Sequence, residues 1–373
     1  MTLPKTCKAA VVTEYGAPIE VRDVKMPETL EPGAMLVKID VASICGSDVH
    51  QWEGRLGLPL EFPFILGHEM VGIIKAFGEG VTHDSIGQEL KIGDRILFTH
   101  ASCGRCETCR VLKMPNACKN RKYYMMQSSE KYPYLTGGFA EYCYVFPLSP
   151  SVKIPDGVKS EWASGASCAF RTVVDGFVRI DRIGGMNWND TLVIQGSGPL
   201  GLYATAIAST KGPKDIIVIG APDKRLEIAK EWGATHIISI DQHPDPADRQ
   251  KVIMELTNGK GADVLIEASG AIGAFVEGMG ILANNGRYIV LGQVGGPEVP
   301  FAADLITKKN ATIIGMLSAD IDAYYKALRF IEQYRDRFDF DLMFSNTYKL
   351  NQINLAIEKM REFEEIKPLI KPY

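Results

Sequence analysis

Two cysteines and one histidine carry the side chains of a catalytic zinc site, although they lie far apart in the sequence. They are Cys45, His68 and Cys168. Two thiolates and one imidazole leave the fourth position of a tetrahedral zinc ion open, which is the arrangement of a catalytic rather than a structural site. Asp48 and Glu69 supply carboxylates that orient the imidazole or exchange as a ligand. Taken singly, Cys168 also fits a buried thiol and His68 a structural histidine, so the hypothesis requires the three residues to meet.

Four further cysteines are crowded into a stretch of sixteen residues. They are Cys103, Cys106, Cys109 and Cys118. Four thiolates at this spacing can close a tetrahedron around one zinc ion and leave no position for a substrate, so we expect a structural site. An iron–sulfur ligand set and a zinc ribbon that binds nucleic acid are the alternatives.

The cysteine usage indicates a reducing compartment, and the net charge disfavours nucleic acid and membranes as partners. Crowded cysteines in a chain without an export signal indicate metal ligation in a reducing cytosol rather than disulfides. The opening residues lack the basic flank and apolar run of such a signal, and no run of about twenty apolar residues occurs. The net charge of −4 gives no general attraction to nucleic acid or anionic lipid. We therefore expect a cytoplasmic protein that binds neither nucleic acid nor a membrane.

A glycine-rich turn has the pattern of a phosphate-binding loop. Gly196, Gly198 and Gly201 follow the apolar residues of an expected strand and open an expected helix. Pro199 and Leu200 belong to the first turn of that helix. The first glycine permits a tight turn, the second lets a pyrophosphate approach the backbone, and the third allows helix and strand to pack. Because the helix N-terminus offers free N–H groups to phosphate, we expect a dinucleotide site. A glycine-rich turn without a ligand is the alternative.

The choice between NAD and NADP depends on the end of the next strand. An acid at this point accepts hydrogen bonds from the adenosine ribose and repels a 2′-phosphate, but Gly220 stands here. Asp223 and Arg225 follow within reach of the ribose, and Asp223 equally suits the N-cap of the next helix. We expect NAD, with NADP as the alternative. Ser269 and Gly292 lie near later strand ends and are expected to fix the nicotinamide ring.

The pattern along the chain predicts two kinds of unit that must position these residues. Residues 1–155 alternate short β-rich runs with glycine, proline and aspartate turns, which predicts a small barrel-like β unit. Residues 185–318 alternate six apolar strands with helices, and strands that are apolar at every position suit a sheet buried on both faces. The right-handed crossover rule then predicts a doubly wound parallel sheet. Residues 319–373 are too short for a domain, and we expect them to rejoin the first unit.

These motifs together resemble a zinc-containing alcohol dehydrogenase of the medium-chain dehydrogenase/reductase superfamily. The resemblance covers essentially the whole length and rests on segments 45–50, 67–69, 138–142 and 196–201, on Cys168 and on the cysteine quartet. It implies an α/β fold with a chaperonin-like (GroES-like) β-rich catalytic domain over residues 1–170 and 319–373, and a Rossmann coenzyme-binding domain over residues 171–318. It also implies two zinc ions per chain and a homodimer or homotetramer, with residues 291–301 near a dimer contact.

The resemblance further implies the reaction and its substrate. Zinc lowers the pKa of an alcohol, and hydride passes from the alcohol carbon to the coenzyme. Ser47 is similar to the family's relay hydroxyl, and His50 is expected to pass the proton through the ribose to solvent. Polyol and threonine dehydrogenases of the family tend to carry glutamate where this chain has Cys168, which favours secondary or cyclic alcohols with a ketone or aldehyde product. The alternatives are a polyol- or threonine-type dehydrogenase, a zinc-independent quinone or enoyl reductase, and a non-enzymatic dinucleotide-binding protein.

Overall fold

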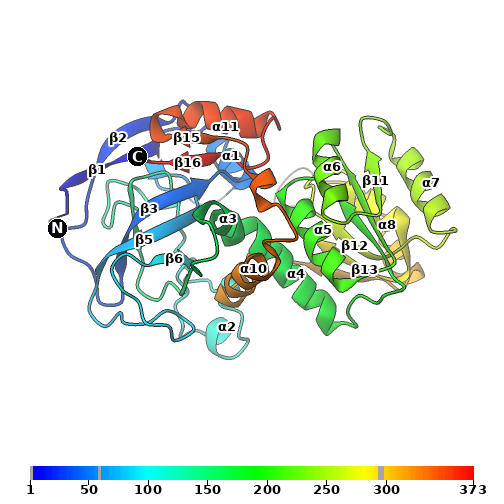
Figure 1. Ribbon diagram of the computed structural model, residues 1–373, viewed down its shortest axis with the longest axis horizontal. Helices are drawn as coiled ribbons and strands as arrows, with labels where there is room; N and C mark the ends of the chain where they lie inside the picture. Colours follow the sequence, from blue (N-terminus) through cyan, green and yellow to red (C-terminus); the bar gives the residue numbers. More distant parts are fainter. Residues whose placement is uncertain (1–2, 58–59, 293–297) are drawn as a thin grey trace. The chain divides into compact units, whose positions relative to one another are not determined.

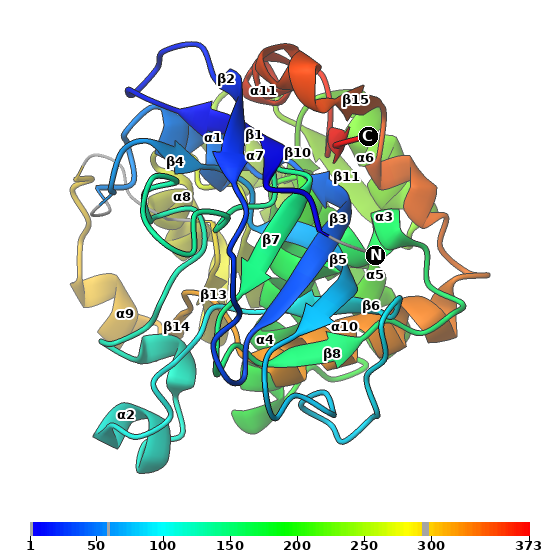
Figure 2. The same ribbon diagram turned by 90° about the vertical axis from the view of Figure 1, so that its left-hand side faces the viewer.

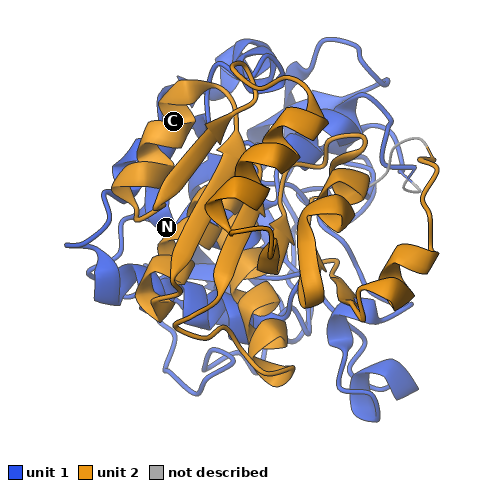
Figure 3. Cartoon of the chain, turned by 90° about the vertical axis from the view of Figure 1, so that its right-hand side faces the viewer, with its two compact units in different colours: residues 1–168, 319–373 blue, residues 169–318 orange. Residues whose placement is uncertain are grey.

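The computed structural model describes residues 3–57, 60–292 and 298–373. The chain divides into two compact units, shown in different colours in Figure 3. The first unit comprises Met1–Cys168 and Ala319–Tyr373, and the second comprises Ala169–Ser318. The first boundary lies two residues before the change of domain expected at residue 170. The segment expected near a dimer contact includes residues 293–297, which lie outside the described residues.

The first unit is built mainly on antiparallel β-sheet. Its strands are β1 (Thr6–Val12), β2 (Glu20–Lys25), β3 (Met35–Ser43), β4 (Phe64–Ile65), β5 (Glu69–Phe77), β6 (Arg95–Phe98), β7 (Tyr142–Val145), β8 (Ser151–Lys153), β15 (Thr347–Lys349) and β16 (Leu369–Lys371). Within the described residues they form a three-stranded sheet, β2-β1-β4, and a seven-stranded sheet, β15-β16-β3-β5-β6-β8 with β7 beside β3. Figure 2 shows β3, β5 and β7 side by side.

The end of β3 brings together three segments that are distant in the sequence. Ser43, the last residue of β3, pairs with Glu69 of β5 on one side. On its other side Ser43 pairs with Leu369 of the C-terminal strand β16. Because β3 is buried over most of its length, this register is set by the core, and it places the C-terminal segment beside the start of β5.

Short helices complete the first unit. They are α1 (Gly46–Trp52), α2 (Glu107–Arg110), α3 (Ser160–Gly165), α10 (Ile321–Tyr334) and α11 (Ile353–Arg361), with 3₁₀ turns at Pro115–Ala117, Phe340–Met343 and Leu350–Gln352. The longest of them, α10, buries Ala323, Ala327 and Ile331 at helical spacing, as expected for a helix with one apolar face. None of the helices in the described residues is long and apolar enough to cross a membrane.

The second unit contains a parallel sheet whose successive strands are connected along the chain mostly by helices (Figure 1). The described strands are β9 (Thr191–Gln195), β10 (Asp215–Gly220), β11 (His236–Ser239), β12 (Ala262–Glu267), β13 (Leu282–Val290) and β14 (Thr312–Gly315). The described helices are α4 (Arg171–Arg182), α5 (Pro199–Lys211), α6 (Asp223–Glu231), α7 (Pro246–Leu256), α8 (Ala274–Ile281) and α9 (Asp304–Lys308). All pairs in the order β11-β10-β9-β12-β13-β14 are parallel, which confirms the predicted doubly wound sheet. The order reverses between β9 and β12, where such sheets bind ligands at their carboxyl ends.

Candidate active site and metal centres

Four potential metal ligands gather in the interior of the first unit. They are Cys45, His68, Glu69 and Cys168, and one ligand atom from each lies within 4.8 Å of all the others. A hydrogen bond with the Cys168 thiol and burial raise the pKa of Cys45 to about 12. Without a metal the Cys45 thiol therefore stays protonated at neutral pH, whereas a bound cation takes the place of its proton. The donor set fits zinc, which favours sulfur and nitrogen ligands.

Asp48 joins the two loops that carry Cys45 and His68. Its buried carboxylate accepts hydrogen bonds from the backbone N–H groups of Cys45 at 2.9 Å and Gly67 at 3.2 Å. The same carboxylate lies 3.0 Å from Nδ1 of His68. Burial lowers the pKa of His68, but the adjacent Asp48 raises it well above its ordinary value overall. Because Nδ1 is engaged by Asp48, Nε2 is the nitrogen left to bind a metal.

Cys168 lies in a π-helical turn. This turn, Ala166–Phe170, joins α3 to α4 in a continuous helical segment. A π turn inserts one extra residue into the helical repeat and changes the direction of the side chains within it, and such turns are frequent at functional sites. The local sequence contains no signal that predicts this turn, although it contains the cysteine.

Glu69 is held from one side by two residues of the first unit. Its Oε2 accepts hydrogen bonds from Oγ of Ser43 and Nζ of Lys367. Its Oε1 is buried and has no hydrogen-bond partner among the residues that the structure describes. Burial raises the pKa of Glu69 to about 7, although Lys367 opposes the shift. Sequence reasoning missed Lys367, whose only signal is a lysine within an apolar terminal segment.

The cysteine quartet forms a second centre in the first unit. The Sγ atoms of Cys103, Cys106, Cys109 and Cys118 lie within 4.8 Å of one another. Three of the Sγ–Sγ distances are 3.5 Å, 3.5 Å and 3.8 Å. Zinc–sulfur bonds of about 2.3 Å in a tetrahedron place sulfur atoms about 3.8 Å apart, so the quartet fits a single zinc ion. Backbone N–H groups of Arg105 and Cys106 lower the pKa of Cys103 to about 6, whereas burial and the neighbouring thiols raise the pKa of Cys109 to about 12, so a metal must displace the proton of Cys109.

Ser47 and His50 both lie on α1. Oγ of Ser47 is 3.3 Å from Nε2 of His68, so this hydroxyl lies beside the first ligand cluster. His50 lies in the last turn of the helix, with its side chain exposed. Partial desolvation, followed by the charge of Arg55, lowers the pKa of His50 below its ordinary value.

The glycine turn of the second unit leads from β9 into α5. Gly196 has a φ of +111°, which favours glycine. A Cβ at Gly201 would lie 1.8 Å from the carbonyl oxygen of Gly196, so the strand and helix pack too closely for any side chain. A Cβ at Gly198, the N-cap residue, would meet nothing within 4 Å, so the N-terminus of α5, with Pro199 and Leu200 in its first turn, is open to a ligand.

The end of β10 excludes an acid for steric reasons. A Cβ at Gly220 would lie 2.3 Å from Oγ and 2.8 Å from the backbone nitrogen of Ser197. Asp223 is exposed and begins α6, while Pro222 occupies the N-cap, so the expected alternative of an Asp223 cap is wrong. Arg225 is 7% exposed, and burial lowers its pKa.

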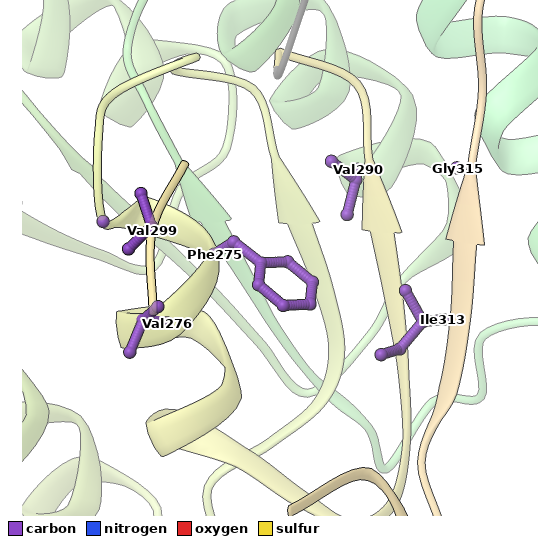
Figure 4. A pocket seen from close by; sticks show the side chains of 7 residues that line it. Phe275, Val276, Val290, Val299, Ile313 and Gly315 are labelled. Atoms are coloured by element: carbon purple, nitrogen blue, oxygen red, sulfur yellow. The ribbon is translucent and has the colours of Figure 1, made fainter. Parts of the chain in front are cut away.

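An apolar hollow of about 430 Å³ also lies in the second unit (Figure 4). Its described lining includes Phe275, Val276, Val290, Val299 and Ile313. Among the described residues of the lining there is no site residue expected from the sequence and no titratable side chain.

Comparisons with known proteins agree with both units. The model of the alcohol dehydrogenase GroES-like domain matches residues 31–156, and the model of the zinc-binding dehydrogenase family matches residues 199–333. A 5-exo-hydroxycamphor dehydrogenase from Pseudomonas putida is 33% identical over 341 residues, which cover 91% of this chain and 92% of the relative. An L-threonine 3-dehydrogenase from Pyrococcus horikoshii is 30% identical over 355 residues, which cover 93% of this chain and 92% of the relative. The structure of an alcohol dehydrogenase from Thermotoga maritima matches with a TM-score of 0.90 at 30% identity, covering 99% of this chain and 100% of that chain.

The chain therefore belongs to the zinc-binding dehydrogenase family of the medium-chain dehydrogenase/reductase superfamily. It is an enzyme, an oxidoreductase of the alcohol dehydrogenase type with zinc as a cofactor. The expected family, the GroES-like and Rossmann folds and the enzymatic activity are confirmed, and the non-enzymatic alternative is wrong.

Proposed function

We propose that this enzyme transfers hydride between a secondary or cyclic alcohol and NAD(P), with zinc held by Cys45, His68 and Cys168. The observation that carries the proposal is the gathering of their ligand atoms, with that of Glu69, within 4.8 Å in a member of this family. Zinc supplies Lewis acidity that lowers the pKa of an alcohol oxygen, and the nicotinamide ring accepts the hydride. A zinc-independent quinone or enoyl reductase would have no need of this ligand set. The cysteine quartet is assigned to a structural zinc ion.

Residues of the first unit are assigned the proton transfer. Ser47 relays the proton of the alcohol, because its Oγ accepts that proton as it donates its own hydroxyl proton onward; the assignment is supported by the 3.3 Å distance between Oγ and Nε2 of His68. His50 accepts the proton and releases it to solvent, which suits an exposed imidazole whose lowered pKa keeps it neutral at pH 7. Asp48 orients the imidazole of His68, and Glu69 serves as an exchange ligand through its unpartnered Oε1.

Residues of the second unit are assigned the coenzyme. The turn Gly196–Gly201 receives the pyrophosphate at the N-terminus of α5, with Gly198, Pro199 and Leu200 lining the approach. NAD rather than NADP is supported by the exposed carboxylate of Asp223 after β10 and by the burial of Arg225, which withdraws its charge from a 2′-phosphate. Ser269 and Gly292, beyond the ends of β12 and β13, are assigned to the nicotinamide side.

One relative supports a secondary or cyclic alcohol as the substrate, and other relatives support a polyol or threonine as the alternative. The relative from Pseudomonas putida is named for hydroxycamphor, a cyclic secondary alcohol, and it is 33% identical to this chain. Sorbitol and L-threonine 3-dehydrogenases at 29% to 30% identity support a polyol- or threonine-type dehydrogenase as the second candidate. Cys168, in place of the glutamate expected in that second class, favours the first.

We also propose that the enzyme is a cytoplasmic homodimer or homotetramer. Within the described residues β14 is an edge strand of its sheet, with β13 as its partner, and a sheet edge is a template for pairing with another chain. Light scattering on the purified protein measures the subunit number, and a monomeric mass would contradict this assignment.

A coenzyme and substrate screen tests the function. Purified enzyme is assayed by absorbance at 340 nm with NAD⁺ or NADP⁺ against cyclic secondary alcohols, sorbitol and L-threonine, and its zinc content is measured. We expect about two zinc ions per chain and the highest kcat/KM with a cyclic secondary alcohol and NAD⁺. A higher value with sorbitol or L-threonine would favour the second candidate, and full activity in a Cys45→Ser variant would contradict the assigned zinc ligands.

A further inference from the structure

Glu267, the last residue of β12, holds a buried carboxylate beneath two loops of the second unit. Its side chain is 0% exposed. Oε1 accepts hydrogen bonds from the backbone N–H of Ser269 at 2.7 Å, from Oγ of Ser269 at 2.8 Å and from the N–H of Gly270 at 2.7 Å. Oε2 accepts a hydrogen bond from the N–H of Gly292 at 3.0 Å. No ion pair in the described part of the chain includes Glu267, so these four donors alone offset the cost of burying its charge.

The two loops held by Glu267 touch each other through their backbones. A Cβ at Gly292 would lie 2.4 Å from the nitrogen of Gly270 and 2.9 Å from Oε2 of Glu267. A Cβ at Gly270, where φ is +67°, would lie 2.6 Å from the carbonyl oxygen of Gly292. Only glycine fits at either position, which lets one carboxylate reach the N–H groups of both loops at once.

The loop after β12 also lies directly against the glycine turn after β9. A Cβ at Gly196 would lie 3.0 Å from the backbone nitrogen of Ser269. The N–H of Ala268 donates to the carbonyl oxygen of Gln195 at 2.8 Å. Ser269 and Gly270 are nevertheless exposed on their other side. The Glu267 carboxylate is therefore buried beneath the exposed residues that follow β12, next to the ends of β9 and β13.

We propose that Glu267 is the positioning residue of the coenzyme site, which it assembles before the coenzyme binds by holding the loop after β12 against the turn at Gly196 and Gly292 against that loop. The proposal rests on the proposed dinucleotide binding at this sheet edge. A neutral amide cannot replace the carboxylate, because its NH₂ group would face either the N–H of Gly292 or the three donors at Oε1. If the loops are not held in place, part of the free energy of coenzyme binding is used to order them, and the affinity for coenzyme falls.

A conservative variant with a matched control tests this role. Glu267→Gln is expected to raise the Kd of NADH, measured by its fluorescence, and the KM of the coenzyme by about tenfold, the loss expected for one charge-assisted hydrogen bond. The zinc content is expected to stay close to wild type, because Glu267 belongs to neither ligand cluster of the described residues. Glu267→Asp keeps the charge but shortens the reach, and an intermediate Kd is expected.

The control is Glu277→Gln in the same unit. Glu277 forms a two-bond ion pair with Arg249 at 2.8 Å for each bond, and within the described residues its carboxylate forms no hydrogen bond with Ser269, Gly270 or Gly292. We expect this variant to lower the Tm while leaving the Kd of NADH within twofold of wild type. If both variants raise the Kd to the same extent for a given loss of Tm, the effect of Glu267 is general destabilisation and the proposal is overturned.

A second measurement needs no variant. Hydrogen exchange of the coenzyme-free wild-type enzyme is expected to show protected amides at Ser269, Gly270 and Gly292, with little added protection when NADH binds. Amides that become protected only with NADH would show that the loops are not assembled beforehand and would overturn the proposal. Failure of the wild type to bind either NADH or NADPH would instead contradict the proposed function, so the two failures are distinguishable.

Discussion

Lys367 and Glu69 are 298 residues apart in the sequence, yet Nζ of Lys367 donates a hydrogen bond to Oε2 of Glu69 inside the first unit. The lysine side chain is 1% exposed and the glutamate side chain 0%. The pairing follows from sheet register, because Ser43 at the end of β3 pairs with Glu69 on one side and with Leu369 on the other. Because both side chains are removed from water, the loss of either one would leave the other as an uncompensated buried charge.

Replacing Lys367 by methionine is expected to lower the free energy of unfolding by about 3–5 kcal/mol, because the variant leaves the Glu69 carboxylate buried without its cation. Urea unfolding followed by circular dichroism measures the change. Lys326→Met is the control, since Lys326 forms an exposed ion pair with Asp322, and we expect it to cost less than about 1 kcal/mol. Equal losses in the two variants would mean that the buried pair contributes no more than an exposed one.

Replacing Asp48 by asparagine is expected to weaken zinc binding at the first centre by about 10- to 100-fold, the usual effect of losing a carboxylate that orients a histidine ligand. The variant also disturbs the hydrogen bonds to Cys45 and Gly67, which fix the two ligand loops. Competition with a chromophoric chelator measures the affinity, with the exposed Asp322→Asn as control. Wild-type affinity in Asp48→Asn would show that Asp48 does not position His68.

Local patterns were enough to predict the parallel sheet and the residues that gather. Strands that are apolar at every position report burial on both faces, and β9 is buried along its whole length as this pattern requires. Cys45, His68 and Cys168 stand out only as a set, because two thiols and one imidazole together match a zinc ligand set, whereas His68 alone also fits a structural histidine.

The contacts that position these residues could not be predicted from local patterns. Lys367 meets Glu69 only through the register of three strands, and no property of the C-terminal segment specifies its partner. The π turn at Cys168 has no local sequence signal that predicts it. The hydrogen bond between Glu267 and Gly292 likewise depends on the neighbouring positions of β12 and β13.

Replacing Cys118 by serine is expected to reduce the zinc content from about two ions per chain to one, because the quartet loses one of its four thiolates. Atomic emission on the purified protein measures the content. The control is Cys143→Ala, since Cys143 is a buried cysteine outside both ligand clusters of the described residues. A content of two in Cys118→Ser would contradict a four-thiolate structural site.

The role of His50 predicts a pH dependence. A neutral imidazole must accept the proton, so activity is present above the pKa of His50 and falls as the pH decreases through it. Desolvation and Arg55 lower this pKa, so the acid limb of kcat/KM for alcohol oxidation is expected at a pH below about 6.5. His50→Gln is expected to lower kcat about 100-fold and to remove this limb, whereas His236→Gln, at a partly exposed histidine of β11, is expected to leave both unchanged. An acid limb that persists in His50→Gln would assign it to another group.

Replacing Gly220 by aspartate is expected to destabilise the second unit rather than to create a selective NAD site. The new Cβ would lie 2.3 Å from Oγ of Ser197 and 2.8 Å from its backbone nitrogen, so the glycine turn must shift. Overpacking of this kind costs about 1–3 kcal/mol, and because the turn is also the assigned pyrophosphate site, the Kd values of NADH and NADPH are expected to rise together. Calorimetry and fluorescence titration measure the two effects. The double variant Gly220→Asp with Ser197→Gly removes the side-chain part of the clash and is expected to recover stability; a single variant as stable as wild type, with a Kd raised for NADPH alone, would instead show that the turn tolerates an acid there.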